Sequence, residues 1–226
     1  MTPATGTLPV DAIVFDMDGV LVDSEPLHTR ATTLLLADCG LDWDESESAE
    51  YIGLTDIESF AALKQRHGLA GDPADLAARW TDRTIVLLQE HARPLPGVPA
   101  VPLALRERGY RLALASSSRP SVIAATLDAI GARHLFELFV SGAEVSRGKP
   151  SPDIFLETAR RLGVSPAHCL VIEDSHHGVT AARAAGMRCL AIPCATTAHQ
   201  DFTHATARLT TLPDVLTYLD LSPQTA

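Results

Sequence analysis

Apolar residues in the second half of the chain fall into short continuous runs, separated by segments with helical spacing. The runs cover residues 112–115, 138–141, 169–172 and 189–192, and a similar run, 12–15, lies near the N-terminus. Each is short and almost wholly apolar, which is typical of strands buried on both faces of a sheet rather than of half-exposed antiparallel strands. We interpret these runs as strands.

The segments between the runs carry helix start and stop residues. Residues 152–162 begin with a proline in the first turn and are followed by Gly163, and residues 178–185 are followed by Gly186. Strands that alternate with helices in this way indicate a parallel sheet with helices on both faces. The sequence therefore predicts an α/β fold with a doubly wound parallel sheet.

A different pattern occupies the chain between residues 23 and 97. Apolar residues recur there at helical spacing, as in Leu34, Leu35, Phe60, Leu63, Trp80 and Leu88. The flanks 24–26 and 93–97 are rich in residues that break regular structure, and we interpret them as hinges. The prediction is a helical cap domain, residues 24–96, inserted into an α/β core domain of residues 1–23 and 97–226, with 1–9 as a disordered tail.

Composition narrows the classes of function. The 226-residue chain is 46% hydrophobic and 20% charged, as expected of a globular protein, and its formal net charge is -10. This charge disfavours nucleic acid and anionic membrane surfaces as partners, because both reward clustered Lys and Arg. No stretch approaches the roughly 18 consecutive apolar residues of a membrane span, and the first ten residues lack signal-peptide features.

The chain has four cysteines, Cys39, Cys169, Cys189 and Cys194, without the CxxC spacing of zinc or redox sites. Three of them lie in or beside apolar runs, so buried free thiols are favoured over disulfides. Free thiols persist in reducing compartments, and a cytoplasmic protein is therefore expected.

Polar residues suited to phosphate chemistry follow four of the predicted strands. Ligands of open parallel sheets bind outside the carboxyl ends of the strands, so residues at these ends can meet despite large separations in sequence. The candidates are Asp16 and Asp18 after 12–15, Ser116, Ser117 and Ser118 after 112–115, Lys149 after 138–141, and Glu173 and Asp174 after 169–172. We expect these groups to gather at one edge of the sheet.

Each group supplies something that phosphoryl transfer requires. Carboxylates from two strands can hold Mg2+, which prefers an octahedron of oxygen ligands and leaves a position for a phosphate oxygen. Serine hydroxyls and backbone N–H groups can bind the other phosphate oxygens, and an ammonium group can neutralise charge between a carboxylate nucleophile and phosphorus. Each group also has a structural explanation, since Asp forms turns, Ser and acidic residues cap helices and loop lysines are commonly solvated. Their joint placement favours the functional interpretation.

Five segments together resemble the haloacid dehalogenase superfamily, close to its β-phosphoglucomutase-like and sugar-phosphatase group. They are 14–21 (VFDMDGVL), 23–28 (DSEPLH), 115–118 (ASSS), 148–155 (GKPSPDIF) and 172–175 (IEDS). They occur in the family's order and span nearly all of the chain after the tail. The second aspartate, Asp18, disfavours the dehalogenases themselves, whose pattern lacks it.

The resemblance implies roles for the acidic residues. Asp16 would be the nucleophile that takes the phosphoryl group as an aspartyl phosphate. Asp18 would protonate the leaving group and then act as the base that activates water. Mg2+ would be held by the Asp16 carboxylate, the Asp18 backbone carbonyl and Asp174, with Glu173 in or near the coordination shell.

The resemblance also implies how substrate is held. Ser116, the Ser117 backbone and Lys149 would bind the phosphoryl oxygens. The further substrate-binding candidates are Ser118, His28, which matches a family position near the leaving group, and Gly53, the cap glycine. The insertion would close over the active site, exclude water and select the substrate.

The surroundings of Gly53 separate a phosphatase from a phosphomutase. The β-phosphoglucomutase pattern has a Lys and an Arg there, whereas this chain has Ile52 and Asp56. A mutase must grip the second phosphate of a bisphosphate intermediate, and an acidic residue would repel it. Hydrolysis is therefore favoured, unless another cap cation supplies the charge; the candidates are Arg30, Lys64 and Arg66.

The prediction is thus a Mg2+-dependent phosphatase that acts on a small phosphorylated metabolite, foremost a sugar phosphate, as a monomer, because one catalytic centre needs one chain. A β-phosphoglucomutase-like phosphomutase is the alternative within the family. From other classes, a phospho-receiver domain predicts a shorter chain without an insertion, and a catalytically silent binding module predicts loss of Asp16 or Asp18. His176 and His177 follow the acidic pair, but Mg2+ prefers oxygen ligands, so we interpret them as surface residues.

Overall fold

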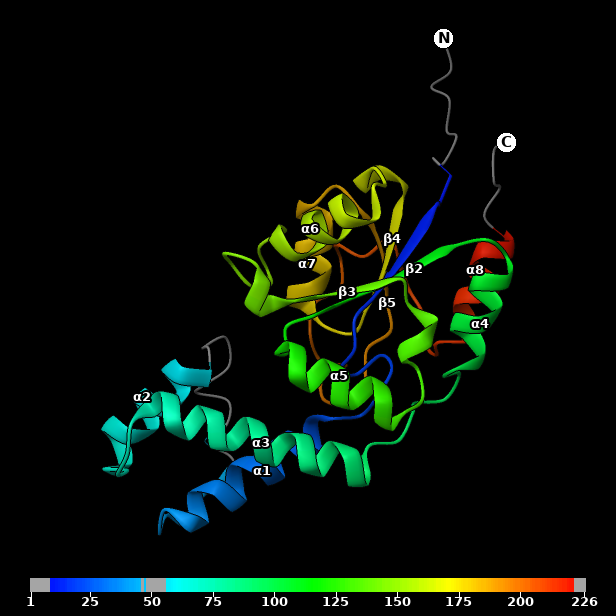
Figure 1. The fold of residues 1–226 in the computed structure, drawn as a ribbon. Coiled ribbons are helices and arrows are strands. Elements are labelled where there is room, and N and C mark those ends of the chain that lie inside the picture. Colours follow the sequence, from blue (N-terminus) through cyan, green and yellow to red (C-terminus); the bar gives the residue numbers. More distant parts are fainter. Residues whose placement is uncertain (1–8, 46, 48–55, 222–226) are drawn as a thin grey trace. The chain divides into compact units, whose positions relative to one another are not determined.

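The computed structural model describes residues 9–45, 47 and 56–221, and the chain divides into two compact units. The core unit consists of Met1–Asp23 and Arg93–Ala226, and the helical unit of Ser24–Ala92. All labelled strands belong to the core unit (Figure 1). Ile52, Gly53 and residues 1–8 of the predicted tail lie outside the described residues.

The described residues of the core unit form one parallel six-stranded sheet. Its strands are β1 (Ala12–Phe15), β2 (Arg111–Ser116), β3 (Leu138–Ser141), β4 (Cys169–Glu173), β5 (Arg188–Ala191) and β6 (Ala207–Arg208). Their order is β3-β2-β1-β4-β5-β6, so the chain moves outward from β1 to β3 and then returns to the other side of β1. This doubly wound topology confirms the predicted fold class. The short strand β6 was not predicted, because two residues carry no recognisable period.

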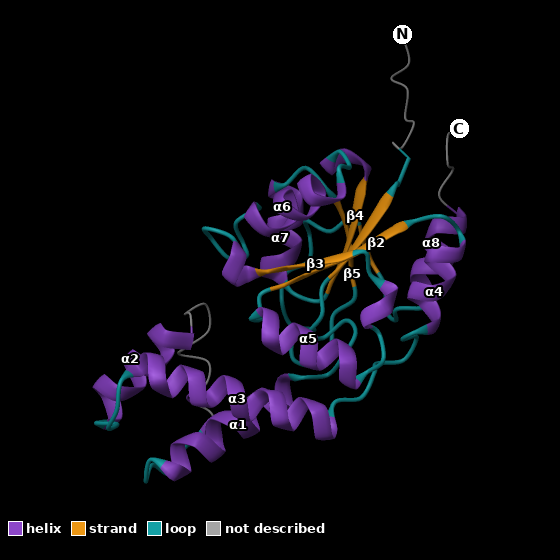
Figure 2. Cartoon of the chain, in the orientation of Figure 1, coloured by secondary structure: helices purple, strands orange, loops and turns teal. Residues whose placement is uncertain are grey.

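Successive strand residues face two buried layers, as the strand period of two requires. Val14 belongs to a cluster with residues of α6 (Asp153–Leu162) and α7 (His176–Ala184). Figure 2 shows these helices on one face of the sheet and α4 (Ala100–Glu107), α5 (Pro120–Ala129) and α8 (Asp214–Leu221) on the other. Full burial of one large apolar side chain contributes roughly 1.5–3 kcal/mol. These two layers hold the strands, and hence their carboxyl ends, in fixed register.

Short turns and caps connect these elements. Within the described residues of the core unit, 3₁₀ turns cover Arg133–Leu135, Gly142–Glu144 and Pro166–His168. Helix α7 begins two residues earlier than predicted, because the Ser175 side chain accepts a hydrogen bond from the Gly178 N–H (3.1 Å) and caps its first turn. This cap fixes the path of the chain directly after Glu173 and Asp174.

The helical unit contains α1 (Glu25–Asp38), α2 (Asp56–His67) and α3 (Pro73–His91). Helix α3 packs against both of the others, and its N-terminus is capped by the Asp72 side chain, which accepts from the Ala74 N–H (2.8 Å). The buried apolar residues of the helical unit form a separate cluster, which consists of Leu35, Leu36, Trp43, Phe60, Leu63, Leu69, Leu76 and Ala77. None of the helices within the described residues has the length and apolarity that crossing a membrane requires.

Candidate active site

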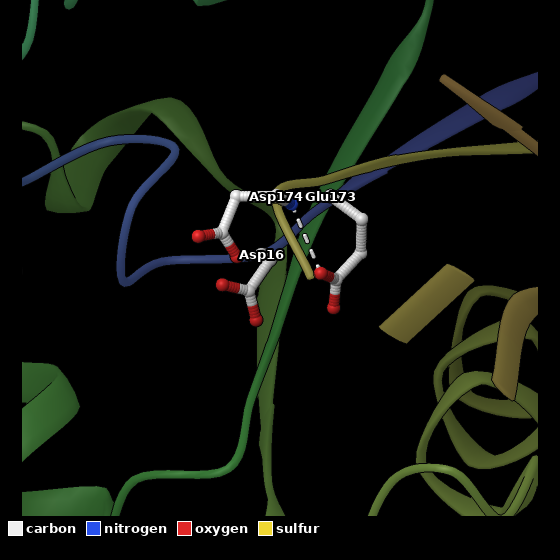
Figure 3. A group of neighbouring side chains, drawn as sticks. All are labelled: Asp16, Glu173 and Asp174. Atoms are coloured by element: carbon white, nitrogen blue, oxygen red, sulfur yellow. Dashed lines mark hydrogen bonds between the residues drawn. The ribbon is translucent and has the colours of Figure 1, made fainter. Parts of the chain in front are cut away.

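The carboxyl ends of neighbouring strands bring the candidate residues of the core unit together. Asp16 directly follows β1, and its N–H donates to the carbonyl of Ile172 in β4 (2.9 Å). Glu173 ends β4, and Asp174 follows it. Because β1 and β4 are hydrogen-bonded neighbours, the three carboxylates converge, as Figure 3 shows.

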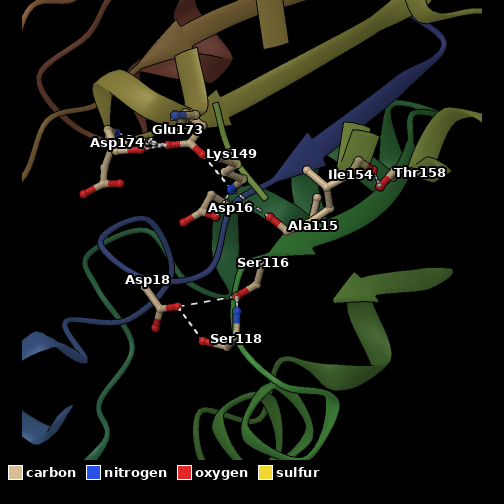
Figure 4. A network of polar contacts seen from close by, with 12 residues as sticks. Asp16, Asp18, Ala115, Ser116, Ser118, Lys149, Ile154, Thr158, Glu173 and Asp174 are labelled. Atoms are coloured by element: carbon tan, nitrogen blue, oxygen red, sulfur yellow. Dashed lines mark hydrogen bonds and ion pairs between the residues drawn. The ribbon is translucent and has the colours of Figure 1, made fainter. Parts of the chain in front are cut away.

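Lys149 lies at the centre of this cluster. Its Nζ donates to Asp16 Oδ1 (2.5 Å), Glu173 Oε1 (2.7 Å) and the Ala115 carbonyl (3.2 Å), and its side chain is only 7% exposed (Figure 4). Burial alone lowers the pKa of Lys149, but the two carboxylates outweigh burial and raise this pKa above its ordinary value. The site therefore favours a charged ammonium group beside Asp16.

Glu173 is an anchor whose two oxygens are both occupied by protein donors. Oε1 accepts from Lys149, and Oε2 accepts from the N–H of Asp174 (3.0 Å), the N–H of Ser175 (3.0 Å) and the Ser175 hydroxyl (2.9 Å). A Cβ on Gly178 would lie 1.7 Å from Oε1, so this position of α7 requires glycine while Glu173 keeps its place. Glu173 thus holds Lys149 and the turn after β4.

Three buried carboxylates give the site an excess of negative charge. Asp16, Glu173 and Asp174 each offer an oxygen within 4.8 Å of the others, and Lys149 is the cation that contacts two of them. Burial, followed by the charge of Glu173, raises the pKa of Asp174 to about 8. Burial also raises the pKa of Asp16, which Lys149 opposes. Clustered carboxylate oxygens of this kind are the donor set that a hard divalent cation prefers.

Asp18 faces a different set of partners from those of the acidic cluster. Its Oδ2 accepts from the hydroxyls of Ser118 (3.2 Å) and Ser116 (3.4 Å), and the Ser118 N–H donates to Ser116 Oγ (3.1 Å) (Figure 4). The Ser141 hydroxyl donates to the Ser118 carbonyl (2.6 Å) and fixes this loop. The carboxylate of Asp18 lies at the serine side of the site.

The other predicted substrate-binding residues lie elsewhere in the chain or have backbone roles. Ser117 sits in a close backbone contact, since a Cβ on Gly142 would lie 2.9 Å from its carbonyl oxygen. His28 belongs to the helical unit, where its ring stacks on Trp80 (centroids 5.6 Å apart, planes at 24°). Gly53, as stated above, is outside the described residues.

Several residues that hold this site were not among the candidates predicted from the sequence. Gly19 has φ +79°, and a Cβ on it would lie 2.3 Å from Asp174 Oδ2. A glycine at this position therefore lets the loop after β1 approach the Asp174 carboxylate. Cys194 and Thr197, from the loop after β5, contact the same oxygen. The family motif already contained Gly19 as a signal, whereas a lone Cys and a lone Thr carry none.

The helical unit has a pocket of its own, with a volume of about 160 Å³. Its described lining combines apolar and polar residues, and consists of Trp43, Phe60, Leu63, Trp80, Glu25, His28, Thr29, Thr32, Asp56 and Ser59. The Trp80 Nε1–H donates to the Thr32 hydroxyl (3.0 Å) and fixes the indole. A rigid aromatic wall beside hydroxyls and carboxylates suits a neutral polyhydroxylated group.

Comparisons with known proteins agree with this architecture. The family model described as haloacid dehalogenase-like hydrolase matches residues 10–186. Protein CbbY of Cereibacter sphaeroides is 35% identical over 230 residues, which cover 96% of this chain and 100% of that protein. Fructose-1-phosphate phosphatase YqaB of Escherichia coli is 35% identical over 175 residues, which cover 77% and 92%.

Solved structures show the same relationship. The crystal structure of CbbY from Rhodobacter sphaeroides in complex with phosphate has a TM-score of 0.84 and 33% identity, and the match covers 94% of this chain and 100% of that one. A CbbY mutant in complex with xylulose 1,5-bisphosphate has a TM-score of 0.82 and 31% identity, with 90% and 95% coverage. The resemblance inferred from the motifs is confirmed, and the chain belongs to the haloacid dehalogenase-like hydrolase family.

Proposed function

We propose that this hydrolase is a Mg2+-dependent phosphatase that removes phosphate from a small sugar or polyol phosphate through an aspartyl phosphate on Asp16. The observation that carries the proposal is the buried contact of Asp16 Oδ1 with Lys149 Nζ (2.5 Å) inside a cluster of three carboxylates. An anionic nucleophile needs such a cation to approach an anionic phosphate. The phosphatase names of relatives such as YqaB support it.

The first half-reaction is assigned to Asp16 and Asp18. Lys149 holds Oδ1 of Asp16, and we assign the second carboxylate oxygen to the attack on phosphorus. The bond from phosphorus to the substrate alcohol oxygen breaks as the new bond to Asp16 forms, and Asp18 gives its proton to the departing oxygen. Ser116 and Ser118, which hold the Asp18 carboxylate in this structure, lie at the same strand end and suit the phosphoryl oxygens.

The second half-reaction uses the same residues in reverse roles. Asp18, now ionised, takes a proton from a water molecule that attacks the phosphorus of the aspartyl phosphate. The phosphorus bond to Asp16 breaks, which releases phosphate and restores the free carboxylate. Asp16 and Glu173 outweigh burial and raise the pKa of Lys149, which favours its charged form in the resting enzyme.

The donor set fits a divalent cation, and Mg2+ is our choice. Three carboxylates and one ammonium group leave two uncompensated negative charges in a buried site when all are ionised. We assign the Asp16 and Asp174 carboxylates and the Asp18 backbone carbonyl as the ligands of Mg2+. Glu173 is not assigned as a ligand, because protein donors occupy both of its oxygens. When bound, the ion would polarise the phosphate and neutralise its charge.

We assign substrate selection to the helical unit, as a cap. The described residues that line its pocket include the carboxylates Glu25 and Asp56 and contain no Lys or Arg. A second phosphate would be repelled there, whereas sugar hydroxyls can bond to Thr and Ser and a sugar face can stack on Trp80. We therefore propose a monophosphate substrate, although CbbY has been crystallised with a bisphosphate. A phosphomutase is the second candidate.

We further propose that the enzyme acts as a cytoplasmic monomer. All assigned core residues come from one chain, and the four cysteines are free thiols, which a reducing compartment preserves. Light scattering coupled to gel filtration measures the mass directly, and a dimer would contradict this part of the proposal.

The test is phosphate release from p-nitrophenyl phosphate and from a panel of sugar monophosphates and bisphosphates, with Mg2+ or with EDTA. We expect Mg2+-dependent release that Asp16→Asn abolishes and that Asp11→Asn preserves, because Asp11 is an exposed residue at the opposite end of β1. Turnover by pure Asp16→Asn would show that Asp16 is not the nucleophile. Isomerised product in place of free phosphate, with glucose 1,6-bisphosphate as primer, would favour the phosphomutase.

A further inference from the structure

The loop after β5, residues 192–206, reaches the acidic cluster from the side opposite to β1. Strand β5 is the neighbour of β4 in the sheet, and the Ile192 N–H donates to the Glu173 carbonyl (2.7 Å) directly after the last paired strand residue. The loop therefore starts at the same sheet edge as Glu173 and Asp174. None of its residues belongs to the family motifs named above.

Two side chains of this loop hold one oxygen of Asp174. The Cys194 thiol donates to Asp174 Oδ2 (3.2 Å), and the Thr197 hydroxyl donates to the same atom (3.4 Å). A thiol is a weak donor, but a carboxylate acceptor strengthens the bond. Gly19 closes the other side of this oxygen, since a Cβ there would lie 2.3 Å from it. The rotation of the Asp174 carboxylate is thus set by contacts on Oδ2.

The loop is itself anchored, so these contacts come from a fixed support. The Cys194 N–H donates to Thr197 Oγ1 (3.0 Å), and the Ala198 N–H donates to the Cys194 carbonyl (2.9 Å), which closes a turn around the pair. Farther along, the Gln200 side chain accepts from the His176 N–H (2.7 Å), which ties the loop to the start of α7. Helix α7 begins two residues after Asp174.

Asp174 needs such support because like charges surround it. Asp16 and Glu173 lie within the same cluster, and Lys149 contacts those two carboxylates. A carboxylate must be ionised to bind a metal ion, and Coulombic repulsion at this range then favours rotation of an untethered carboxylate away from its neighbours. Groups that hydrogen-bond to metal ligands orient them, and their loss typically weakens metal binding by about 10–100-fold.

We propose that Cys194 is a positioning residue, which holds Asp174 Oδ2 and thereby presents the Asp174 carboxylate to the divalent cation. The inference rests on the proposed function, because that function makes Asp174 a ligand. Thr197 assists from the same turn at a longer distance. The thiol takes no part in the phosphoryl transfer steps.

The test compares Cys194→Ala, which removes the donor, with Cys194→Ser, which keeps one of similar size. Direct binding of Mg2+ is measured by titration calorimetry, and binding of Mn2+ by electron paramagnetic resonance, in the absence of substrate. We expect the dissociation constant to rise about 10-fold in Cys194→Ala and to return to within about threefold of wild type in Cys194→Ser. The control is Thr203→Val, in the same loop, whose hydroxyl bonds only to Asp201 among the described residues and should leave binding unchanged.

Kinetics provide a second measurement. In Cys194→Ala the Mg2+ concentration for half-maximal phosphatase activity should rise by the same factor, while kcat at saturating Mg2+ stays near that of wild type. Melting in EDTA checks folding; if Cys194→Ala melts well below wild type, Thr197→Val replaces it and must weaken Mg2+ binding.

Two outcomes overturn the inference. One is wild-type metal affinity in Cys194→Ala, and the other is failure of Cys194→Ser to restore affinity, which would indicate packing rather than hydrogen bonding. Either result leaves the proposed function intact if the wild-type protein releases phosphate. A wild-type protein that neither binds Mg2+ nor releases phosphate would instead overturn the proposed function.

Discussion

Replacement of Lys149 by methionine should destabilise the core unit more than any exposed charge replacement. Lys149 is one of only two lysines in the chain, and its Nζ contacts both Asp16 and Glu173, whose side chains are 9% and 1% exposed. Methionine preserves most of the apolar stem but removes the charge and the contact of Nζ with the Phe155 ring (5.2 Å from Nζ to the ring centroid). The variant leaves two buried carboxylates without their cation.

The magnitude follows from that uncompensated charge. Removal of one partner from a buried ion pair typically costs about 3–5 kcal/mol in the free energy of unfolding. For a chain of this size 1 kcal/mol lowers the melting temperature by about 2–4 °C, so Lys149→Met should melt about 6–20 °C below wild type. Adding Asp16→Asn to Lys149→Met removes one of the stranded charges and should recover a substantial part of the loss.

Differential scanning calorimetry in EDTA at neutral pH is the assay, since a bound divalent cation would mask the loss by neutralising the same carboxylates. Lys64→Met is the matched control, because Lys64 is exposed and its Nζ bonds to the Gly71 carbonyl rather than to a carboxylate. Its melting temperature should stay within a few degrees of wild type. If Lys149→Met melts no lower than Lys64→Met, the reasoning about the buried cation is wrong.

Three further predictions concern single residues. Asp18→Asn should lower kcat by about 100-fold or more, because one group serves both half-reactions, and a rate within about twofold of wild type would exclude that role. Gly178→Ala, a change that ordinarily favours a helix by about 1 kcal/mol, should instead lower the melting temperature and weaken Mg2+ binding, because the new Cβ would lie 1.7 Å from Glu173 Oε1. The pKa of Glu144 is lowered chiefly by the hydrogen bond from the Ser141 N–H, so the stability that its charge contributes is present above its ordinary pKa of 4.5 and is lost as pH falls. Glu144→Gln should therefore melt below wild type at neutral pH, and this difference should narrow below pH 4.5; a constant difference would contradict the assignment.

The parallel sheet was predictable because its strands are buried on both faces. Residues 138–141 were delimited correctly, and β2 and β4 extend the predicted runs by one or two residues at their polar ends, Arg111, Ser116 and Glu173. Those ends were missed because a hydrophobic pattern stops at the first polar residue, whereas backbone pairing continues beyond it. Strand β6 owes its place to pairing with β5, which no local pattern encodes.

The gathering of Asp16, Lys149, Glu173 and Asp174 also followed from the strand ends, although their catalytic roles stay predictions. What the sequence did not reveal is how each side chain is turned. Both oxygens of Glu173 accept hydrogen bonds, from Lys149 and from Ser175 at the start of α7, and Asp18 accepts one from Ser118. Rotamers and loop paths decide these contacts. The contact of Cys194 with Asp174 depends on a loop conformation that no motif specifies.

The proposed mechanism depends above all on the identity of the residue that carries the phosphoryl group during turnover. The enzyme is mixed with Mg2+ and substrate, quenched in acid within the first turnover and digested, and its peptides are examined by mass spectrometry. We expect a phosphoryl group on the peptide that contains Asp16, absent from Asp16→Asn and from samples without Mg2+. Phosphate release with no covalent phosphoprotein, or a phosphoryl group on any other residue, would contradict it.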